Sequence, residues 1–269
     1  MIRILSLGLG LQSVTLARMI IRGDLPTVDA MIFADPGWES ASTYQTLALM
    51  QQECSEASIP LHVVSKGNIR ADIMQGGTRF VPLPAYTRNE QGKAAILRRQ
   101  CTDDYKLAPL RQKERELAGL AKGARCPSPV VQRLIGISLD EVQRMKDSRD
   151  AYAVNSYPLV DAGMSRHDCR QWLKRNGYTE PEKSACVGCP FHSDAYWRDK
   201  KRNAPQEFAE AVAVDAQIRT GLHKVQCEGY LHRSLVPLAL VDFSSAEDNG
   251  QETLWGDAFG NECEGMCGL

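Results

Sequence analysis

Hydrophobic and polar residues follow two alternating patterns over the first 66 residues of the chain. Continuous apolar runs, typical of buried strands, occur within residues 2–7, 28–38 and 61–67. Between them, apolar residues recur at helical spacing over 13–23 and 39–58. Strands that alternate with helices in this way predict an α/β fold built on a doubly wound, mostly parallel sheet.

The pattern is less regular in the rest of the chain. Residues 67–100 carry several glycines and prolines and predict a loop-rich flap. The other expected elements are a helix over 108–121, a strand over 129–140, a strand, turn and helix over 157–178, and a helix over 205–221.

Two further features of this pattern concern a helix start and the division into domains. Ser165 is expected to cap the helix within 157–178, with Asp168 as its capping-box partner. We expect an α/β domain over 1–180 and a C-terminal extension over 181–269 that packs on it.

Charge and hydropathy exclude few functions. The chain of 269 residues has 32 Lys and Arg against 33 Asp and Glu, so its net charge favours neither a nucleic-acid nor a membrane partner. No apolar run reaches the roughly 20 residues of a membrane span, and the N-terminus lacks a signal-peptide pattern, which predicts a cytoplasmic protein. Nine cysteines without regular spacing suit buried thiols, metal ligands or catalytic thiols better than disulfides.

The first expected strand ends in the segment "SLGLGLQS", residues 6–13. Backbone N–H groups of such a turn, together with the start of the following helix, form a natural phosphate site. A plain tight turn between strand and helix explains the same residues. The candidate phosphate-binding residues are Ser6, Gly8, Gly10, Gln12 and Ser13.

The second expected strand is followed by "FADPGWESASTY", which contains Asp35 and Glu39. Asp35 comes at the carboxyl end of a strand next to the first, which is where open α/β sheets bind ligands. The alternative is a polar loop that caps the next helix.

Cys186 and Cys189 form a Cys-x-x-Cys pair in "EKSACVGCPFHSD". In a reducing compartment such a pair binds a metal, acts as a redox pair, or consists of two cysteines that are close by chance. The segment by itself does not decide between these interpretations.

Together these segments resemble the adenine-nucleotide α-hydrolase (PP-loop ATP pyrophosphatase) superfamily, and within it the phosphoadenosine phosphosulfate (PAPS) reductases. Residues 6–13 are similar to the pyrophosphate loop Ser-Gly-Gly-x-Asp-Ser, with Gln12 in place of the aspartate. The stretch from Asp35 to Glu39 is similar to the family's Asp-Thr-Gly segment that ends in Glu-Thr. The resemblance implies that these residues bind an adenine nucleotide.

The segment "RRQCTDDYKLAPL" resembles the Cys-Cys-x-x-Arg-Lys-x-x-Pro-Leu motif of iron–sulfur adenylyl-sulfate reductases. Cys101 falls on the first family cysteine, Thr102 on the second, and Lys106 on the lysine, for which the resemblance implies a catalytic role. It also implies that Cys101, Cys186 and Cys189 ligate a [4Fe–4S] cluster, with zinc as the alternative metal.

The last residues, "NECEGMCGL", resemble the tail on which sulfonucleotide reductases carry a nucleophilic cysteine. Either Cys263 or Cys267 would close a four-thiolate site, for which we assign Cys263, or act as the nucleophile. The alternative is a terminal pair without a role.

"IGISLDEVQRMK" is similar to the family's Gly-Ile-Arg stretch, and it places Gly136, Asp140, Glu141 and Arg144 near one rim. The resemblance implies that Gly136 and Arg144 help to bind the nucleotide, whereas a capped helix start explains the acids equally well. His192, His232 and Arg233 are further candidates for holding an anion. Cys54, Cys126, Cys169 and Cys227 have no paired spacing and are interpreted as ordinary thiols.

The resemblance implies an enzyme of sulfur metabolism that uses ATP or an adenylyl sulfonucleotide, with Mg²⁺ as an accompanying ion. One activity is sulfonucleotide reduction, and the other is nucleotide activation followed by sulfur transfer. The second activity is favoured by Thr102, and its acceptor would be a nucleic acid that contacts the basic residues 93–99, served by a thiol or sulfur-donor protein. A nucleotide-binding subunit with a structural zinc is the alternative from another class, and a homodimer is left open.

Overall fold

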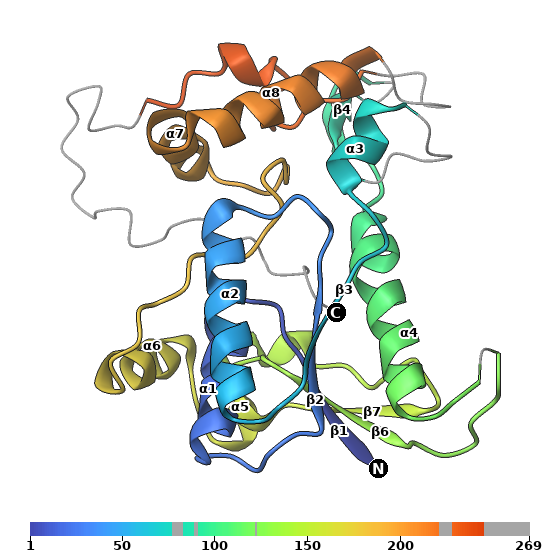
Figure 1. Ribbon diagram of the computed structural model, residues 1–269. Coiled ribbons are helices and arrows are strands. Elements are labelled where there is room, and N and C mark those ends of the chain that lie inside the picture. The colour runs from blue at the N-terminus through green and yellow to red at the C-terminus, as the bar shows by residue number, and fades with distance from the viewer. Residues whose placement is uncertain (77–82, 89–90, 122, 221–227, 245–269) are drawn as a thin grey trace. The chain divides into compact units, whose positions relative to one another are not determined.

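The computed structural model describes residues 1–76, 83–88, 91–121, 123–220 and 228–244 (Figure 1). The chain divides into two compact units. The first contains Met1–Asp35, Glu39–Lys66 and Tyr105–Ser184. The second contains Pro36–Trp38, Gly67–Asp104 and Ala185–Leu269. Residues 67–104 therefore group with the C-terminal part of the chain, while the domain boundary expected at 180 stays a prediction.

A five-stranded parallel sheet forms the centre of the first unit. Its spatial order is β3-β2-β1-β6-β7. The strands are β1 (Ile2–Ser6), β2 (Ala30–Ala34), β3 (Leu61–Val64), β6 (Val131–Ile135) and β7 (Ala153–Ser156). The expected α/β fold with a doubly wound parallel sheet is confirmed. Because the order reverses at β1, the carboxyl ends of β1 and β6 flank the switch point at which such sheets bind ligands.

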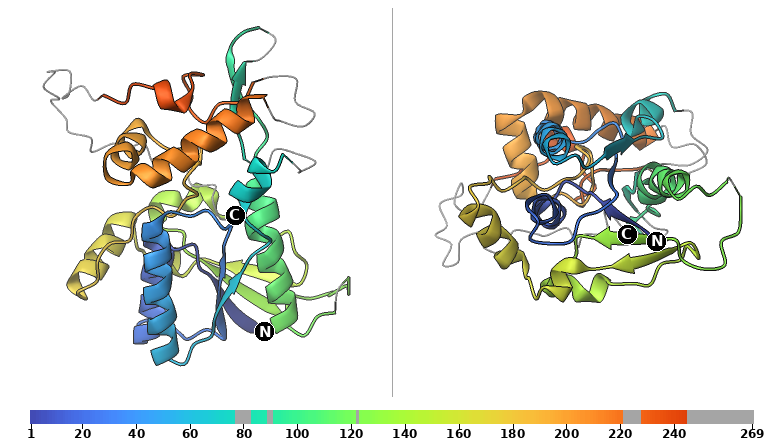
Figure 2. Two further views of the ribbon diagram at one scale, coloured as in Figure 1. Left: turned by 45° about the horizontal axis from the view of Figure 1, so that its top comes forward. Right: turned by 60° about the horizontal axis from the view of Figure 1, so that its bottom comes forward.

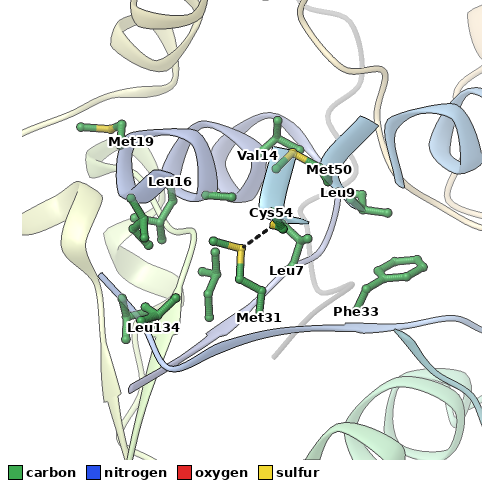
Figure 3. Packing of buried hydrophobic residues seen from close by; sticks show 14 of the residues in the cluster. Leu7, Leu9, Val14, Leu16, Met19, Met31, Phe33, Met50, Cys54 and Leu134 are labelled. Carbon is green, nitrogen blue, oxygen red and sulfur yellow. Dashed lines mark hydrogen bonds between the residues drawn. The ribbon is translucent and has the colours of Figure 1, made fainter. Parts of the chain in front are cut away.

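Helices cover both faces of this sheet (Figure 2). Helix α1 (Leu11–Arg22) packs with α2 (Ala41–Glu56), α5 (Pro158–Asp161) and α6 (Arg166–Arg175), whereas α4 (Ala108–Leu117) packs on β2 and β3. The period of two along each strand divides the core, because successive side chains point to opposite faces. Met31, Phe33 and Leu134 join the cluster under α1 and α2 (Figure 3), and Ile4, Ile32 and Val131 join a second cluster with Leu117.

A buried ionic network ties α4 to β6 on the second face. The guanidinium of Arg133 donates to both carboxylate oxygens of Glu114, at 2.6 Å each, and to Asp150 Oδ2 at 3.0 Å. The Tyr152 hydroxyl donates to Glu114 Oε2 at 3.0 Å. Burial, together with the charge of Glu114, raises the pKa of Tyr152 above its ordinary value, so the hydroxyl remains a donor. The network satisfies a carboxylate whose exposed fraction is 0%.

The second unit contains mostly helices and one hairpin. Its elements are α3 (Ile69–Met74), β4 (Tyr86–Arg88), β5 (Ala94–Ile96), α7 (Asp194–Asn203), α8 (Pro205–Thr220) and the 3₁₀ turn η3 (Leu238–Leu240). Helix α8 packs against α3, α7 and η3. Asp215 on α8 holds the following segment in place, because its carboxylate accepts from the amides of Leu231 and Leu238 at 2.8 and 2.9 Å.

Several elements expected from the sequence are present, and one is wrong. The strands and helices expected within the first 66 residues are present, and the capping box of Ser165 and Asp168 is confirmed. The strand expected at the start of 157–178 is wrong: Pro158 begins the short helix α5, and strand β7 lies just before it. Proline is compatible with the first turn of a helix and supplies no N–H to a strand ladder, which explains the difference.

The stretch over 67–100, expected to be loop-rich, also contains more regular structure than the pattern indicated. Helix α3 and the antiparallel hairpin β4–β5 both lie within it. In the part of the chain that the structure describes, no helix is both long and apolar enough to cross a membrane.

Candidate functional site

The loop between β1 and α1, residues 7–10, is called the glycine loop here. Ser6 ends β1 and pairs in register with Ile32 of β2 and Ile135 of β6. Gly10 is the N-cap of α1, where no side chain makes a capping hydrogen bond and the first turn has no acidic residue. By contrast, side chains cap α2, α3, α6 and α7. The start of α1 therefore keeps the positive dipole end and backbone donors that attract an anion.

Gly136, directly after β6, lies against the first turn of α1. A Cβ atom built on Gly136 would be 2.8 Å from both the Cα and the backbone N of Ser13, so only glycine allows this approach. The Ser13 hydroxyl donates to the Gly10 carbonyl oxygen at 3.1 Å. A Cβ atom on Gly8 would be 3.7 Å from Ser13 Oγ. The fold thus brings the predicted residues Gly8, Gly10, Ser13 and Gly136 together at the switch point.

A polar chain extends from α1 to η2 (Leu139–Arg144), the 3₁₀ segment that follows β6. The Gln12 amide donates to Glu141 Oε2 at 2.9 Å, and Arg144 pairs with Glu141 Oε1 at 2.8 Å. Glu141 and Arg144, which were expected near one rim, therefore lie together, and Gln12 of α1 joins them.

Asp140, which was expected at this rim, has a different role. Its carboxylate accepts from the backbone N–H of Arg166 at the start of α6, at 2.9 and 3.2 Å. Partial burial opposes ionisation of Asp140, but hydrogen bonds from Ser138 and from the Arg166 amide outweigh it and lower the pKa of Asp140. The segment is kinked at Glu141, whose φ of −121° and ψ of 18° are not helical, so the side chains at positions 140 and 141 meet different partners.

Asp35 and Glu39 are held on the carboxyl side of β2 by Tyr44 of α2. The Tyr44 hydroxyl donates to Asp35 Oδ1 at 3.0 Å, and its oxygen accepts from the Glu39 backbone N–H at 3.4 Å. Burial is the main cause that raises the pKa of Tyr44 above its ordinary value, and the Asp35 charge adds to it. The phenol therefore remains protonated and fixes both acidic residues.

The buried Glu39 forms an ion pair with the partly exposed Lys106. Lys106 Nζ lies 2.9 Å from Glu39 Oε1, and the Glu39 side chain is 0% exposed. Lys106 comes from η1 (Thr102–Leu107), a π-helical turn directly before α4. Such turns are rare and frequently occur at functional sites. Two residues that the sequence singled out separately are thus in direct contact.

Residues 186–189, the cysteine turn, have a compact geometry within the second unit. The Cys189 N–H donates to the Cys186 carbonyl oxygen at 3.0 Å, and the Val187 N–H donates to the Trp38 carbonyl oxygen at 3.0 Å. Gly188 lies against the Trp38 indole, so that an added Cβ would be 2.2 Å from Trp38 Cη2. Both cysteines are buried. The turn is therefore rigidly supported, as a metal-binding or redox pair requires.

The remaining predicted ligands are less well defined. Cys101 is half-buried and belongs to the same unit as the cysteine turn. Among the described residues, no three His, Cys, Asp or Glu side chains form a group that could hold a metal ion. Cys263 and Cys267 lie outside the described residues, as does Cys227. The donor set of thiols suits a soft metal or a cluster, but its completion depends on residues beyond those described.

The histidine candidates already have partners inside the second unit. His192 Nε2–H donates to the Cys186 carbonyl oxygen at 2.9 Å, and the His192 ring stacks on Tyr196. His232 and Arg233 both contact the carboxylate of Asp194, at 2.9 and 2.7 Å. These contacts favour structural roles, in which His192 supports the cysteine turn.

Two of the cysteines without paired spacing are buried in the core of the first unit. Burial raises the pKa of Cys54 to about 11 and that of Cys169 to about 12, so both remain protonated thiols at neutral pH. This agrees with their interpretation as ordinary thiols.

Sequence reasoning missed two residues of this region, Trp38 and Tyr44. Tyr44 contacts two candidates that are close to it in the sequence, but hydroxyl contacts of this kind leave no periodic signal. For Trp38 a weak signal existed, because a tryptophan beside a strand end and a glycine within a Cys-x-x-Cys pair are both unusual choices.

Comparison with known proteins adds no assignment to this geometry. No family model matches the chain, and no curated protein matches it. The function must therefore be argued from the residues.

Proposed function

We propose that the chain is an adenine-nucleotide-dependent enzyme of sulfur metabolism, similar to the PAPS and adenylyl-sulfate reductases, and that it works with a [4Fe–4S] cluster. The observation that carries the proposal is the start of α1. No side chain caps this N-terminal end of α1, which directly follows the glycine loop. Gly136 lies so close to it that position 136 cannot carry a side chain. This geometry supports a phosphate site at the switch point of a doubly wound sheet.

The cysteine turn supports the second part of the proposal. Cys186 and Cys189 would hold the cluster together with Cys101 and one terminal cysteine, Cys263 or Cys267. Thr102 replaces the second family cysteine, and its buried hydroxyl has no hydrogen-bond partner among the described residues. When bound, the cluster would supply electrostatic tuning, or an iron that carries sulfide if one ligand position stays open.

Two reactions fit these residues. In reduction, a terminal cysteine thiolate attacks the sulfur of a sulfonucleotide, which forms a thiosulfonate and releases AMP or its 3′-phosphate. In sulfur transfer, an acceptor oxygen attacks the α-phosphorus of ATP and releases pyrophosphate, and sulfur then displaces AMP. Thr102 favours the second reaction, since a complete four-cysteine pattern is missing. Among the predicted catalytic residues, Lys106 is the cation, and it forms an ion pair with Glu39.

A nucleic acid is the acceptor that we favour for sulfur transfer. Exposed basic side chains lie on and beside the β4–β5 hairpin, namely Arg88, Lys93 and Arg98. Phosphate contacts of such residues would give an affinity that falls steeply with salt.

Nucleotide binding is tested by titration calorimetry with AMP and ATP. Ser13→Ala removes the hydroxyl at the glycine loop and is expected to lower the affinity at least about fivefold. Ser165→Ala is the matched control: it removes the cap of α6, and should lower the melting temperature without changing the affinity. Equal affinity of Ser13→Ala and the unaltered protein would remove the phosphate site from the proposal.

The cluster is tested by iron, sulfide and zinc analysis of protein purified without air. A brown protein with about four irons and four sulfides supports the proposal. Stoichiometric zinc without iron would favour the alternative, a nucleotide-binding subunit with a structural metal. Both cysteines of the turn are buried, which favours this alternative because structural zinc sites are closed.

A further inference from the structure

Glu39 has one carboxylate oxygen for which the described residues provide no partner. Oε1 is paired with Lys106, whereas Oε2 is buried and accepts no hydrogen bond from any described residue. A buried polar atom without a partner costs free energy, and native proteins rarely leave one unexplained. A ligand that donates a hydrogen bond to Oε2 would account for it.

The surroundings hold this carboxylate in place. Lys106 contributes a positive charge, and Glu39 directly precedes Ser40, the N-cap of α2, so the positive end of that helix faces it. Tyr44 accepts from the Glu39 backbone N–H and donates to Asp35, which prevents the segment from turning away. Oε2 is therefore held in place as a preorganised acceptor.

The position of Glu39 indicates which ligand group it meets. It follows β2, the strand that pairs with β1, and the glycine loop after β1 is the proposed phosphate site. In doubly wound sheets an acidic residue beyond the second strand accepts a hydrogen bond from a ribose hydroxyl of a nucleotide whose phosphate lies at the first loop. Here too, a loop proposed to bind phosphate follows β1 and a buried acceptor follows the neighbouring strand β2.

We infer that Glu39 Oε2 accepts a hydrogen bond from a ribose hydroxyl, and that it selects adenine nucleotides with free 2′- and 3′-hydroxyls against 3′-phosphorylated ones. This inference rests on the proposed function. A 3′-phosphate at neutral pH carries only acceptor oxygens and negative charge, so it opposes a buried carboxylate twice. The substrate class is therefore ATP or adenylyl sulfate, and PAPS is excluded.

The test compares AMP with adenosine 3′,5′-bisphosphate on the full chain by titration calorimetry. The unaltered protein is expected to bind AMP at least about tenfold more tightly than the bisphosphate. It should also bind ATP about tenfold more tightly than the deoxy-ATP, 2′ or 3′, that lacks the hydroxyl donating to Glu39. These measurements need no substitution, so they do not depend on the folding of a variant.

Glu39→Gln then identifies the residue responsible. The variant loses the charged acceptor, so AMP should bind about tenfold more weakly. Because the glutamine amide can donate to a phosphate, the bisphosphate should keep or gain affinity. Glu53→Gln is the matched control, because Glu53 also pairs with a cation, Arg18, between α2 and α1, and its loss should leave the nucleotide preference unchanged.

The outcomes separate this inference from the proposed function. Equal binding of AMP and the bisphosphate, or an equal loss of both in Glu39→Gln, would overturn the role of Glu39 and leave the nucleotide site in place. Absence of binding for every adenine nucleotide would overturn both.

Discussion

Gly188 in the cysteine turn offers the sharpest test of how the second unit is packed. Replacing it with alanine would place a methyl group 2.2 Å from Trp38 Cη2 and 2.5 Å from Trp38 Cζ3. The indole cannot move freely, because it is 4% exposed and its Nε1–H donates to Glu210 Oε2 at 3.0 Å. Overpacking of this kind costs about 1–3 kcal/mol, and loss of the hydrogen bond to a charged acceptor adds about 1.5–3 kcal/mol.

A combined loss of about 3 kcal/mol corresponds to a fall in melting temperature of roughly 6 to 12 °C for a chain of this size. We expect Gly188→Ala to show it by differential scanning calorimetry, together with a lower iron content, since the Val187 N–H is bonded to the Trp38 carbonyl oxygen. Gly10→Ala is the control: no atom lies within 4 Å of the position of its Cβ and its φ is −88°, so no overpacking arises, and its melting temperature should fall by less than about 4 °C through the weaker N-cap preference of alanine.

Trp38→Phe removes the outer ring atoms that the new methyl group would meet. Alone it lowers stability through a cavity and the lost bond to Glu210. In the double variant Gly188→Ala with Trp38→Phe the methyl group has room, so the combined loss should be at least about 1 kcal/mol smaller than the sum of the single losses. Additive losses would refute the close approach between Gly188 and the indole.

Three other substitutions test separate parts of the structure. Tyr152→Phe removes one of the two donors to the buried Glu114 Oε2, the other being Arg133, and should cost about 1–2 kcal/mol, or roughly 2 to 8 °C in melting temperature; an unchanged value would contradict the network. Asp140→Asn should lower the melting temperature at pH 6, and the difference should vanish as the pH falls through the lowered pKa of Asp140, below its ordinary 3.8; a difference that is the same at low pH would rule out the charged bond to Arg166. Cys186→Ser should lose the iron that the unaltered protein binds, and a retained iron content would exclude this ligand.

The fold could be predicted largely from the sequence, because its signals are local. The apolar runs that became β1, β2 and β3 are continuous, and the helices between them follow a helical period. The strand expected within 157–178 was misplaced because residues 158–161 are as apolar as a strand, and only the fixed φ of Pro158 favours a helix. Helix α3 and the β4–β5 hairpin were missed because each is too short to show a period.

The candidate site could be predicted in part, for a different reason. Gly8, Gly10 and Ser13 share one loop, so their neighbourhood follows from the strand before them and the helix after them. The close approach of Gly136 to Ser13 depends on β6 pairing with β1. Such a contact joins residues far apart in the sequence, and a glycine shows only that something is close, without showing what.

Gln12 and Glu141 together supply polar groups to the rim. The pyrophosphate loop with which residues 6–13 were compared has an aspartate where this chain has Gln12. In this fold, however, the Gln12 amide donates to Glu141, so a carboxylate is present at the same rim on a different element. An aspartate at position 12 would set two carboxylates against each other at the distance of a hydrogen bond, where like charges repel strongly. Gln12 and Glu141 therefore have to be considered as one unit, in which the carboxylate lies on η2 and is partly balanced by Arg144.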